Sequence, residues 1–297
     1  MKNQFSEVAG KLLVRAPAKL NLTLLIAGKR PDGYHEIETV MAKVDWYDEL
    51  LFEPGADDRI ELVCKGPRWA PHGEANLVHQ ACRMLYDFTG ARPGIKLTLT
   101  KNIPAASGLG GGSSDAAAAL IGLNRFAQLG AGADKLFEIA ARLGSDVPFF
   151  LGGPLALCKG RGEKIDEFAE EFSFQAILVL PGIRVSTKRV YENYIHDHKL
   201  YNDFSSKINK FIAEKKIDFL TKMCANMLAR SSFQLYERLA DLKARIETLG
   251  IGPVALSGSG SVMYWVVGSD GQDVKHYQSM LNDVVGCESV IVHNNRW

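Results

Sequence analysis

The sequence has 297 residues, of which 46% are hydrophobic and 23% are charged, so it is long enough for two domains with cores of their own. Its 35 Lys and Arg residues almost balance its 34 Asp and Glu residues and leave a formal net charge of +1. This balance argues against non-specific binding to nucleic acids or acidic membranes, which usually depends on a basic surplus. A small anionic ligand stays compatible with it, because a few local cations suffice.

Five cysteines are scattered along the chain without a C-x-x-C pair. An odd, unpaired set does not suit a disulfide framework or a zinc cluster and is typical of a reducing cytoplasm. The sequence has no apolar run of about 18 residues, as a transmembrane helix requires, and its start does not resemble a secretory signal. We therefore expect a cytoplasmic protein that acts without a membrane or a nucleic acid.

The first part of the chain is predicted to be rich in strands. Pro, Asp and Gly within Arg30–His35 predict a tight turn. Apolar residues at helical spacing predict helices over Asn76–Phe88 and over Ala133–Leu143, the second ending at Gly144. Alternating or branched apolar residues predict strands at Leu12–Arg15, Lys19–Ile26, Glu36–Val44, Leu50–Glu53, Arg59–Val63 and Ile95–Lys101.

An acidic, polar stretch at Glu163–Phe172 marks the expected domain boundary, which we place so that the domains span residues 1–168 and 169–297. Short connections between mixed helices and strands favour an α+β class for both. In the second domain we expect strands at Gln175–Leu180, Val254–Ser257, Val262–Val267 and Glu288–Val292, with helices at Thr187–Tyr194, Ser205–Ala213, Leu235–Leu249 and Asp273–Leu281.

The strongest chemical signal is the run GLGGGSS at Gly108–Ser114, between a predicted strand and an Ala-rich helix whose expected N-cap is Ser114 or Asp115. Four glycines leave backbone N–H groups bare, and the helix start adds its own unpaired N–H groups and positive dipole end. A nucleotide phosphate is the natural ligand. The alternative is a flexible surface loop, which rarely joins a strand directly to a helix. Neither G-K-[ST] nor G-x-G-x-x-G occurs, so the run is not a Walker A or Rossmann loop.

Three segments together resemble the motifs of the GHMP kinase superfamily in order and spacing. They are APAKLNLTL at residues 16–24, PAASGLGGGSSDAAAAL at residues 104–120 and ALSGSGSVMYWVV at residues 255–267. The resemblance implies an ATP-binding N-terminal domain of the ribosomal protein S5 domain 2-like type over residues 1–168. It also implies a ferredoxin-like C-terminal domain, with ATP and substrate in the cleft between the two.

Within that superfamily, KLNLTLLIAGKRPDGYHEIETVM, GLGGGSSDAAAAL and GSDVPFFLGG resemble the branch that phosphorylates a cytidine-diphosphate-linked methylerythritol in non-mevalonate isoprenoid synthesis. The resemblance is densest before Gly162 and thinnest between His196 and Leu249. It implies transfer of the γ-phosphate of ATP, accompanied by Mg²⁺, to the 2-hydroxyl of this small-molecule substrate. The sequence leaves the oligomeric state open, and we expect a monomer or a weak homodimer.

Asp146 and Lys19 are the candidate catalytic residues. A carboxylate beside an alcohol can accept its proton, and a nearby lysine can keep that carboxylate ionised and stabilise a transferring phosphoryl group. By resemblance, the two match the catalytic pair of the family. Taken alone, Asp146 is equally suited to shape the turn expected after Gly144, and Lys19 to face solvent from a strand. Whether Asp146 acts as a full base or as an electrostatic orienter stays open.

Asn21, Tyr34, His35 and Tyr191 are the candidate substrate contacts besides Asp146. An aromatic ring can stack on a pyrimidine, and a histidine can hydrogen-bond to a base edge. The resemblance implies that Tyr34, His35 and Tyr191 hold the cytosine, while Asn21, on the strand face of Lys19, contacts the polyol or the base. Packing within a turn or a core is the alternative for both tyrosines.

The remaining candidates are ATP contacts, and no metal-ligating side chain is assigned. His196-x-His198 lacks a clear third ligand, and Mg²⁺ should arrive with ATP, held mainly by phosphates and water. Asn76 and Lys101 are candidates for adenine, although Asn76 is also suited to cap a helix and Lys101 to face solvent. The resemblance implies that the phosphates contact Pro104, Gly108, Leu109, Gly110, Gly111, Gly112, Ser113 and Ser114.

Three positions depart from the family pattern. Ser107 stands where Gly is common, and Ser145 stands where Ala is usual. Val262 in the third motif lacks the hydroxyl that the commoner residue there supplies, so we expect no polar role for it. None of these changes touches Gly108–Gly112.

Two rival functions stay open at this stage. A sibling kinase acting on homoserine or mevalonate would keep the three motifs, but its small substrate would not need the aromatic pair Tyr34 and His35. A non-catalytic nucleotide sensor or regulator would keep the fold, and we would expect it to lose Asp146 or Lys19. Binding of a cytidine nucleotide separates the first rival from the reading given above.

Overall fold

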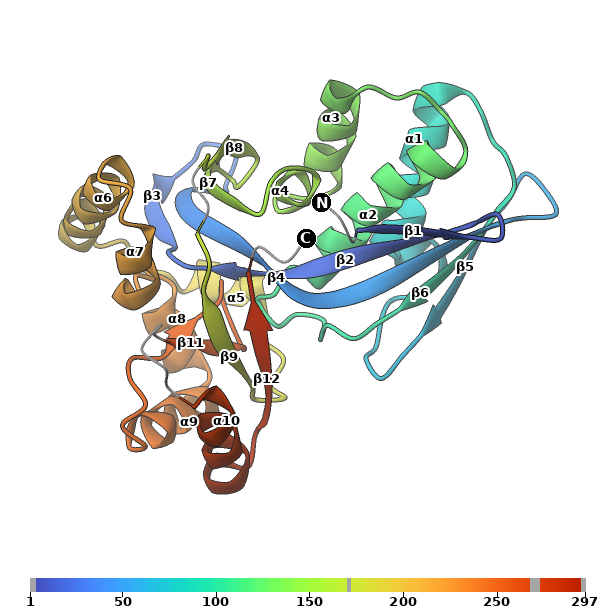
Figure 1. The fold of residues 1–297 in the computed structure, drawn as a ribbon. Coiled ribbons are helices and arrows are strands. Elements are labelled where there is room, and N and C mark those ends of the chain that lie inside the picture. The colour runs from blue at the N-terminus through green and yellow to red at the C-terminus, as the bar shows by residue number, and fades with distance from the viewer. Residues whose placement is uncertain (1–3, 170–171, 268–272, 295–297) are drawn as a thin grey trace.

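The computed structural model describes residues 4–169, 172–267 and 273–294, which form two sheets, each with its own layer of helices (Figure 1). The first part contains β1 (Phe5–Val8), β2 (Lys11–Asn21), β3 (Leu25–Lys29), β4 (His35–Pro54), β5 (Ile60–Lys65), a 3-10 turn (Gly73–Ala75), α1 (Leu77–Thr89), β6 (Ile95–Thr100), α2 (Gly111–Phe126), α3 (Ala133–Leu143), α4 (Val147–Leu151), β7 (Leu155–Gly160) and β8 (Lys164–Glu167).

The second part follows the same mixed pattern. It contains β9 (Gln175–Leu180), α5 (Thr187–Glu192), α6 (His198–Ala213), α7 (Ile217–Met223), α8 (Ala229–Leu235), α9 (Glu237–Glu247), β10 (Ala255–Leu256), β11 (Met263–Val267), α10 (Val274–Met280), a π-helical turn (Leu281–Val285) and β12 (Glu288–His293).

Strand β4 is the axis of the first sheet. In the described part of the chain that sheet has eight strands in the order β1-β2-β4-β6-β5, while β3 and β7 pair with the first half of β4 and β8 pairs with β7. All of these pairs are antiparallel except β5 with β6. Because β4 is 20 residues long, it carries one group of neighbours on each half and joins the two ends of the molecule.

Helices α1, α2, α3 and α4 cover one face of the first sheet (Figure 1). Helix α2 approaches the strands closely because its inward positions are small, a run of four alanines at Ala116–Ala119 followed by Gly122. A Cβ at Gly122 would overlap the ring of Phe52 and lie 3.0 Å from Val14 Cγ2. The missing side chain therefore sets how near α2 sits to β2 and β4.

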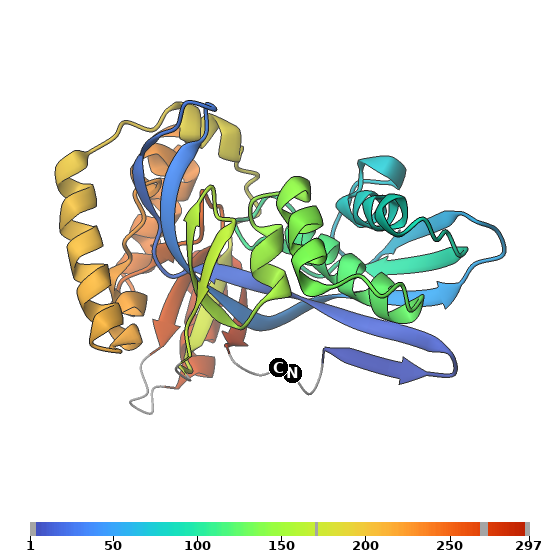
Figure 2. The same cartoon turned by 90° about the horizontal axis from the view of Figure 1, so that it is seen from above.

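The second sheet has the strand order β10-β11-β9-β12, and all of its described pairs are antiparallel. Residues Ile177 and Val179 of β9 pack into a core with α9 and the π-helical turn. Residues Ala176 and Leu178 point to the other side and share a core with Leu20 of β2. Figure 2 shows α6 beside the hairpin of β3 and β4, at the far end of this shared core.

The shared core explains a change of pattern along β2. Its first half alternates between buried and partly exposed residues, whereas residues 16–21 are all buried. One face of the first half meets solvent, while the second half is covered from both sides because the second sheet packs there. Alternation therefore predicts the first half of this strand well and understates the burial of the second.

Most predicted elements are present, two of them with the expected bounds, Ala133–Leu143 and Gln175–Leu180. The strands expected at Glu36–Val44 and Leu50–Glu53 are one continuous strand, β4. The expected cap of α2 at Ser114 or Asp115 is wrong, because the helix already begins at Gly111. Strand β1, strand β8 and helices α4, α7 and α8, each of 7 residues or fewer, were not predicted.

Strand β8 belongs to the first sheet and β9 to the second, so the chain passes between the sheets within the stretch expected to hold the boundary. Residues 170 and 171 of that stretch lie outside the described residues, and the division at 168/169 stays a prediction. Among the described residues, none of the helices is both long and apolar enough to span a membrane.

Adding a methyl group at Gly122 should force α2 away from the sheet. We expect Gly122→Ala to lower the free energy of unfolding by about 1–3 kcal/mol, the usual cost of overpacking a core, as measured by urea denaturation. Gly28→Ala is the matched control, because a Cβ there meets no described atom within 4 Å. Equal stabilities of the two variants would contradict the close packing of α2.

Candidate active site

A cavity of about 950 Å³ opens between the two parts of the molecule and is lined by residues from all three sequence motifs. Its wall contains Lys19 and Asn21 of the first motif, Gly108 and the glycines that follow it, and Gly258 of the third motif. The resemblance implied a ligand cleft between the two domains, and the structure brings the three segments together around one space. The cavity is therefore the candidate active site.

The glycine loop is held by hydrogen bonds with both other motifs. Lys19 N–H of β2 donates to the Leu109 carbonyl at 2.9 Å, and Val262 N–H donates to the Ser107 carbonyl at 3.0 Å. The Ser257 hydroxyl donates to the Gly108 carbonyl at 2.8 Å. With these carbonyls occupied, the loop turns its remaining backbone toward the cavity.

Two glycines of the loop adopt the left-handed backbone conformation that other residues rarely tolerate, Gly108 with φ +84° and Gly110 with φ +69°. A Cβ at Gly108 would overlap the carbonyl of Ser257, and one at Gly110 would lie 2.9 Å from both Lys19 Cγ and Phe150 Cζ. Gly110 is the N-cap of α2. The positive end of that helix therefore points at the cavity directly after the loop, which suits a phosphate.

Lys19 and Asp146 face each other at the centre of the cavity wall. The Lys19 ammonium lies 3.5 Å from Asp146 Oδ2, and the lysine side chain is 5% exposed against 31% for the aspartate. Lys19 also donates to the side-chain oxygen of Asn21, whose amide nitrogen donates to the Thr39 hydroxyl at 2.8 Å. The pair predicted from the sequence is thus assembled, with the carboxylate open to the cavity and the lysine fixed behind it.

Asp146 is the N-cap of helix α4, where the sequence predicted only a turn before a strand. Lys43 of β4 holds the other end of this helix, donating to the carbonyls of Phe150 at 3.0 Å and Gly152 at 2.6 Å. Glu167 of β8 accepts from Gly153 N–H at 2.7 Å. These contacts fix the short segment that carries Asp146. They come from Lys43 and Glu167, which lie outside the sequence motifs.

The far end of the cavity is aromatic. The rings of His35 and Tyr191 have centroids 5.1 Å apart and are tilted by 34°, and Tyr194 meets His35 edge-on at 5.8 Å. Tyr34 is 54% exposed, with the Arg161 guanidinium 5.1 Å from its ring centre. The three residues predicted to hold a base therefore line the same cavity, together with Tyr194 and Arg161, which were not among the predicted site residues.

The pKa of His35 lies below its ordinary value, first because of burial and then because of the positive charges of Lys29 and, when protonated, His196. The ring is therefore neutral at neutral pH, with one nitrogen that donates and one that accepts. A neutral imidazole flanked by phenol rings can bind a flat, hydrogen-bonding heterocycle.

Asn76 and Lys101 are placed differently from the prediction. Asn76 accepts from Val78 N–H at 2.9 Å and donates to the Pro71 carbonyl at 2.8 Å, so it caps α1. The Lys101 ammonium is buried against two carboxylates. Both side chains are committed to partners inside the protein and neither lines the cavity, so we assign them no direct contact with adenine.

The other predicted ATP contacts divide into two groups. Pro104, Gly108, Ser113 and the glycines at 110–112 line the cavity, whereas Leu109 and Ser114 do not. Leu109 is fully buried, and its carbonyl accepts the hydrogen bond from Lys19 N–H. The Ser114 hydroxyl is buried and has no hydrogen-bond partner among the described residues.

Further residues reach the cavity from places that no motif indicates. Thr187 at the start of α5 is one of them, and its hydroxyl lies 2.9 Å from the hydroxyl of Ser259 in the third motif. Trp69, Pro71 and Leu77 form an apolar stretch of the wall. A Cβ on Gly112 would lie 3.8 Å from Leu77 Cδ1, so this stretch adjoins the glycine loop.

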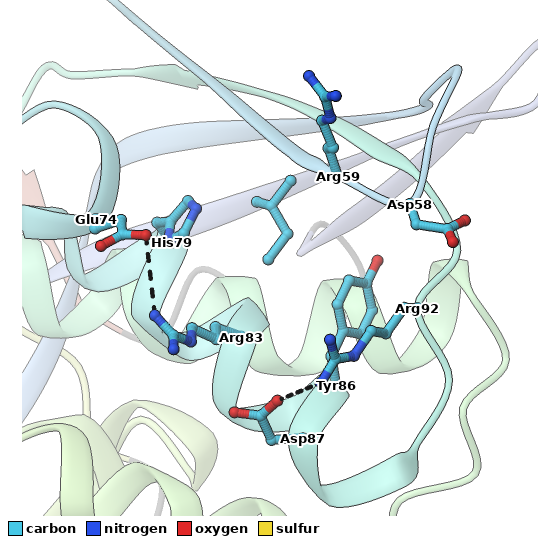
Figure 3. A pocket seen from close by; sticks show the side chains of 9 residues that line it. Asp58, Arg59, Glu74, His79, Arg83, Tyr86, Asp87 and Arg92 are labelled. Carbon is cyan, nitrogen blue, oxygen red and sulfur yellow. Dashed lines mark hydrogen bonds and ion pairs between the residues drawn. The ribbon is translucent and has the colours of Figure 1, made fainter.

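A second cavity, of about 490 Å³, lies away from these motifs, between the start of β5 and helix α1 (Figure 3). Its charges are matched within its own wall, as Arg92 pairs with Asp87 at 3.1 Å and Arg83 lies 3.9 Å from Glu74. In the described part of the chain, no group of three or more His, Cys, Asp or Glu side chains is placed to hold a metal ion. His196 and His198 contact each other, with ring nitrogens 3.0 Å apart.

Comparison with known proteins agrees with this geometry. The model of the N-terminal domain of GHMP kinases matches residues 76–153, which include the glycine loop and Asp146. A homoserine kinase from Cytophaga hutchinsonii shares the fold, with a TM-score of 0.75 over 98% of this chain and 96% of that one at 17% identity. Fold and site together define a small-molecule kinase of the GHMP class.

More similar proteins narrow the class. The 4-diphosphocytidyl-2-C-methyl-D-erythritol kinase of Geobacillus sp. (strain WCH70) is 38% identical over 91% of this chain and 93% of its own length. The enzyme of that name from Bacillus cereus (strain B4264) is 38% identical with the same coverage. A crystal structure of a 4-(cytidine 5'-diphospho)-2C-methyl-D-erythritol kinase aligns with a TM-score of 0.76 and 30% identity, covering 95% of this chain and 98% of that one.

The chain belongs to the family of 4-diphosphocytidyl-2-C-methyl-D-erythritol kinases. The resemblance inferred from the three motifs is thereby confirmed, as is the α+β GHMP kinase fold. The individual site residues remain predictions, supported by the distances given above.

The glycine loop provides a paired test of its geometry. We expect Gly108→Ala to weaken ATP binding by about tenfold or more, because the left-handed conformation alone costs a side chain roughly 1–2 kcal/mol. Gly112→Ala should have a smaller effect, since its Cβ has room beside Leu77. Isothermal titration calorimetry with Mg-ATP measures both. Similar losses in the two variants would contradict the tight packing of Gly108 on the third motif.

Burial lowers the pKa of Lys43 to about 7 from 10.5. Between these values the unfolded chain holds a proton that the folded protein has lost, so this lysine makes the unfolding free energy rise with pH, by up to about 1.4 kcal/mol per unit. In Lys43→Met that contribution disappears.

We therefore expect the stability of the unchanged protein, relative to Lys43→Met, to increase from pH 7 toward pH 10 in urea titrations. Lys65→Met removes an exposed lysine at the end of β5 and controls for the loss of surface charge. If the difference in stability between the unchanged protein and Lys43→Met stays constant with pH, Lys43 is not desolvated as described.

Proposed function

We propose that the protein transfers the γ-phosphate of ATP to the 2-hydroxyl of 4-diphosphocytidyl-2-C-methyl-D-erythritol. The observation that carries this proposal is the Lys19–Asp146 pair, 3.5 Å apart, in a cavity with a glycine loop on one side and the His35–Tyr191 ring pair on the other. Family membership supports the choice of substrate, and the two ends of the cavity suit the phosphates of ATP and the cytosine of that substrate.

The phosphates of ATP are placed against the glycine loop and the start of α2. Backbone N–H groups and the helix dipole stabilise their charge there. The adjoining apolar wall of Trp69, Pro71 and Leu77 suits the adenine ring. We assign to this wall the adenine contact first given to Asn76 and Lys101.

Mg²⁺ arrives with ATP. Ser113 lines the cavity, and a hydroxyl oxygen suits the ion.

Asp146 is placed to accept the proton of the attacking hydroxyl, and Lys19 to stabilise negative charge as the phosphoryl group moves. The acceptor oxygen attacks phosphorus directly, in line with the leaving ADP, and no phospho-enzyme forms. Because the transition state of such a transfer is loose, positioning and charge stabilisation dominate. Asn21 holds the Lys19 ammonium in place and faces the polyol.

The cytosine is assigned to the aromatic end of the cavity. Stacking of a base on an aromatic side chain contributes about 1–3 kcal/mol, and Tyr34 and Tyr191 offer phenol rings. The neutral His35 ring supplies a donor and an acceptor to the base edge. Arg161, beside Tyr34, carries positive charge toward the diphosphate of the same ligand.

The proposal includes a cytoplasmic location and a monomer or weak homodimer. All five cysteines are free, as a reducing compartment would keep them. The small-molecule substrate accounts for the cavity without any partner protein.

The first experiment measures ADP release from purified protein and Mg-ATP, with and without 4-diphosphocytidyl-2-C-methyl-D-erythritol. We expect release to require that substrate and Asp146→Asn to lower kcat by about 10²–10⁴, the usual contribution of a positioned general base. Asp166→Asn, which changes an exposed carboxylate on β8, should leave kcat unchanged.

Other acceptors decide between this function and its rivals. Turnover with homoserine or mevalonate, but not with the cytidylyl substrate, would keep the GHMP kinase class and reject the assignment of His35 and Tyr191 to cytosine. ATP binding without turnover on any of the three acceptors would favour a nucleotide sensor that keeps the fold.

A further inference from the structure

Beneath the glycine loop, three buried charged side chains touch one another. Asp48 of β4 is fully buried, and Lys101 and Asp115 have side chains that are 3% and 4% exposed. The Lys101 ammonium donates to Asp115 Oδ2 at 2.7 Å and to Asp48 Oδ2. Burying three charged groups is unfavourable unless they are paired, so a cluster placed here needs a reason beyond packing.

This cluster, Asp48–Lys101–Asp115, holds the chain on both sides of the loop. The second oxygen of Asp48 accepts N–H bonds from Asn102 at 2.6 Å and Ile103 at 2.9 Å, just before the loop begins. Lys101 grips Asp115 in the first part of α2, just after the loop ends. Through these bonds, Asp48 and Lys101 together fix the distance between the segment before the loop and the start of helix α2.

The cluster also touches the loop itself. A Cβ on Gly111, the first residue of α2, would lie 3.2 Å from the Lys101 ammonium. With only hydrogens at that position, the lysine lies directly behind the backbone that faces the cavity. None of the three charged side chains lines the cavity, so any effect on a ligand must pass through the backbone.

We propose that Asp48, Lys101 and Asp115 are positioning residues that set the geometry of the phosphate loop and thereby the affinity for ATP. The inference rests on the proposed function in one respect, that the loop binds nucleotide phosphates. It differs from the role first predicted for Lys101, since the lysine acts from behind the loop and never touches adenine.

The charge state of the cluster sharpens the proposal. Burial raises the pKa of Asp115 well above its ordinary value, against the opposing effect of Lys101. Asparagine has the same shape and also offers one oxygen to Lys101, so it should replace Asp115 without loss. For Asp48, which accepts three bonds, an amide is a poor substitute because its nitrogen would face a donor.

The test compares Asp115→Asn with Asp115→Leu by calorimetric binding of Mg-ATP and of cytidine diphosphate. We expect Asp115→Asn to bind ATP within about twofold of the unchanged protein. Asp115→Leu removes the acceptor and should weaken ATP binding about tenfold, a change of about 1.4 kcal/mol. Cytidine diphosphate affinity should stay the same in both, because the aromatic end of the cavity is untouched.

The outcomes separate the inference from the proposed function. If the unchanged protein binds no ATP, the function itself fails. If it binds ATP and Asp115→Leu binds equally well, or if both ligands weaken together, the positioning role is wrong. A loss in Asp115→Asn as large as in Asp115→Leu would contradict the positioning role, because asparagine keeps an acceptor oxygen for Lys101. Should Asp115→Leu not fold, Asp115→Ser, which is smaller and polar, is judged by the same criteria.

Discussion

The close contact between the glycine loop and the loop of the third motif is the constraint on which the rest of the site depends. Gly108 lies so near the Ser257 carbonyl that any side chain would collide with it, and the Ser257 hydroxyl bonds back to Gly108. Ser257 directly follows β10 of the second sheet, whereas Gly108 belongs to the first part of the chain. The phosphate loop therefore takes its shape only where the two parts meet, and the cavity is a product of their packing.

Strand β4 brings the remaining chemistry to this meeting point. Along its length it carries His35 at one end, Lys43 near the middle and Asp48 in the second half. His35 faces the aromatic end of the cavity, Lys43 fixes the helix of Asp146, and Asp48 supports the glycine loop from behind. Because a single strand holds all three, the base end, the catalytic carboxylate and the phosphate loop keep fixed distances from one another.

The sequence anticipated the residues that face the ligand better than those that support them. Glycines, a lysine and an aspartate in recognisable motifs identified Gly108, Lys19 and Asp146, because each of these residue types answers a local chemical need. Asn76 and Lys101 show the limit of this reasoning, since polar residues near a motif resemble ligand contacts until their buried partners are known. The partners of Lys101 are 53 and 14 residues away in sequence, and no local pattern connects them.

Sequence alone determined the class of fold and the family, because periodicity, glycine placement and motif order are local properties of the chain; through the same resemblance it proposed the glycine loop for phosphate binding and Lys19 and Asp146 as the catalytic pair. Tertiary structure alone decided that Tyr194 and Arg161 join the aromatic end of the cavity, that Lys43 holds the helix of Asp146 and that Lys101 lies buried between Asp48 and Asp115. The physical reason is that burial and charge pairing depend on which distant segments pack together. No local pattern in the sequence shows these contacts, because they form only when the whole chain folds.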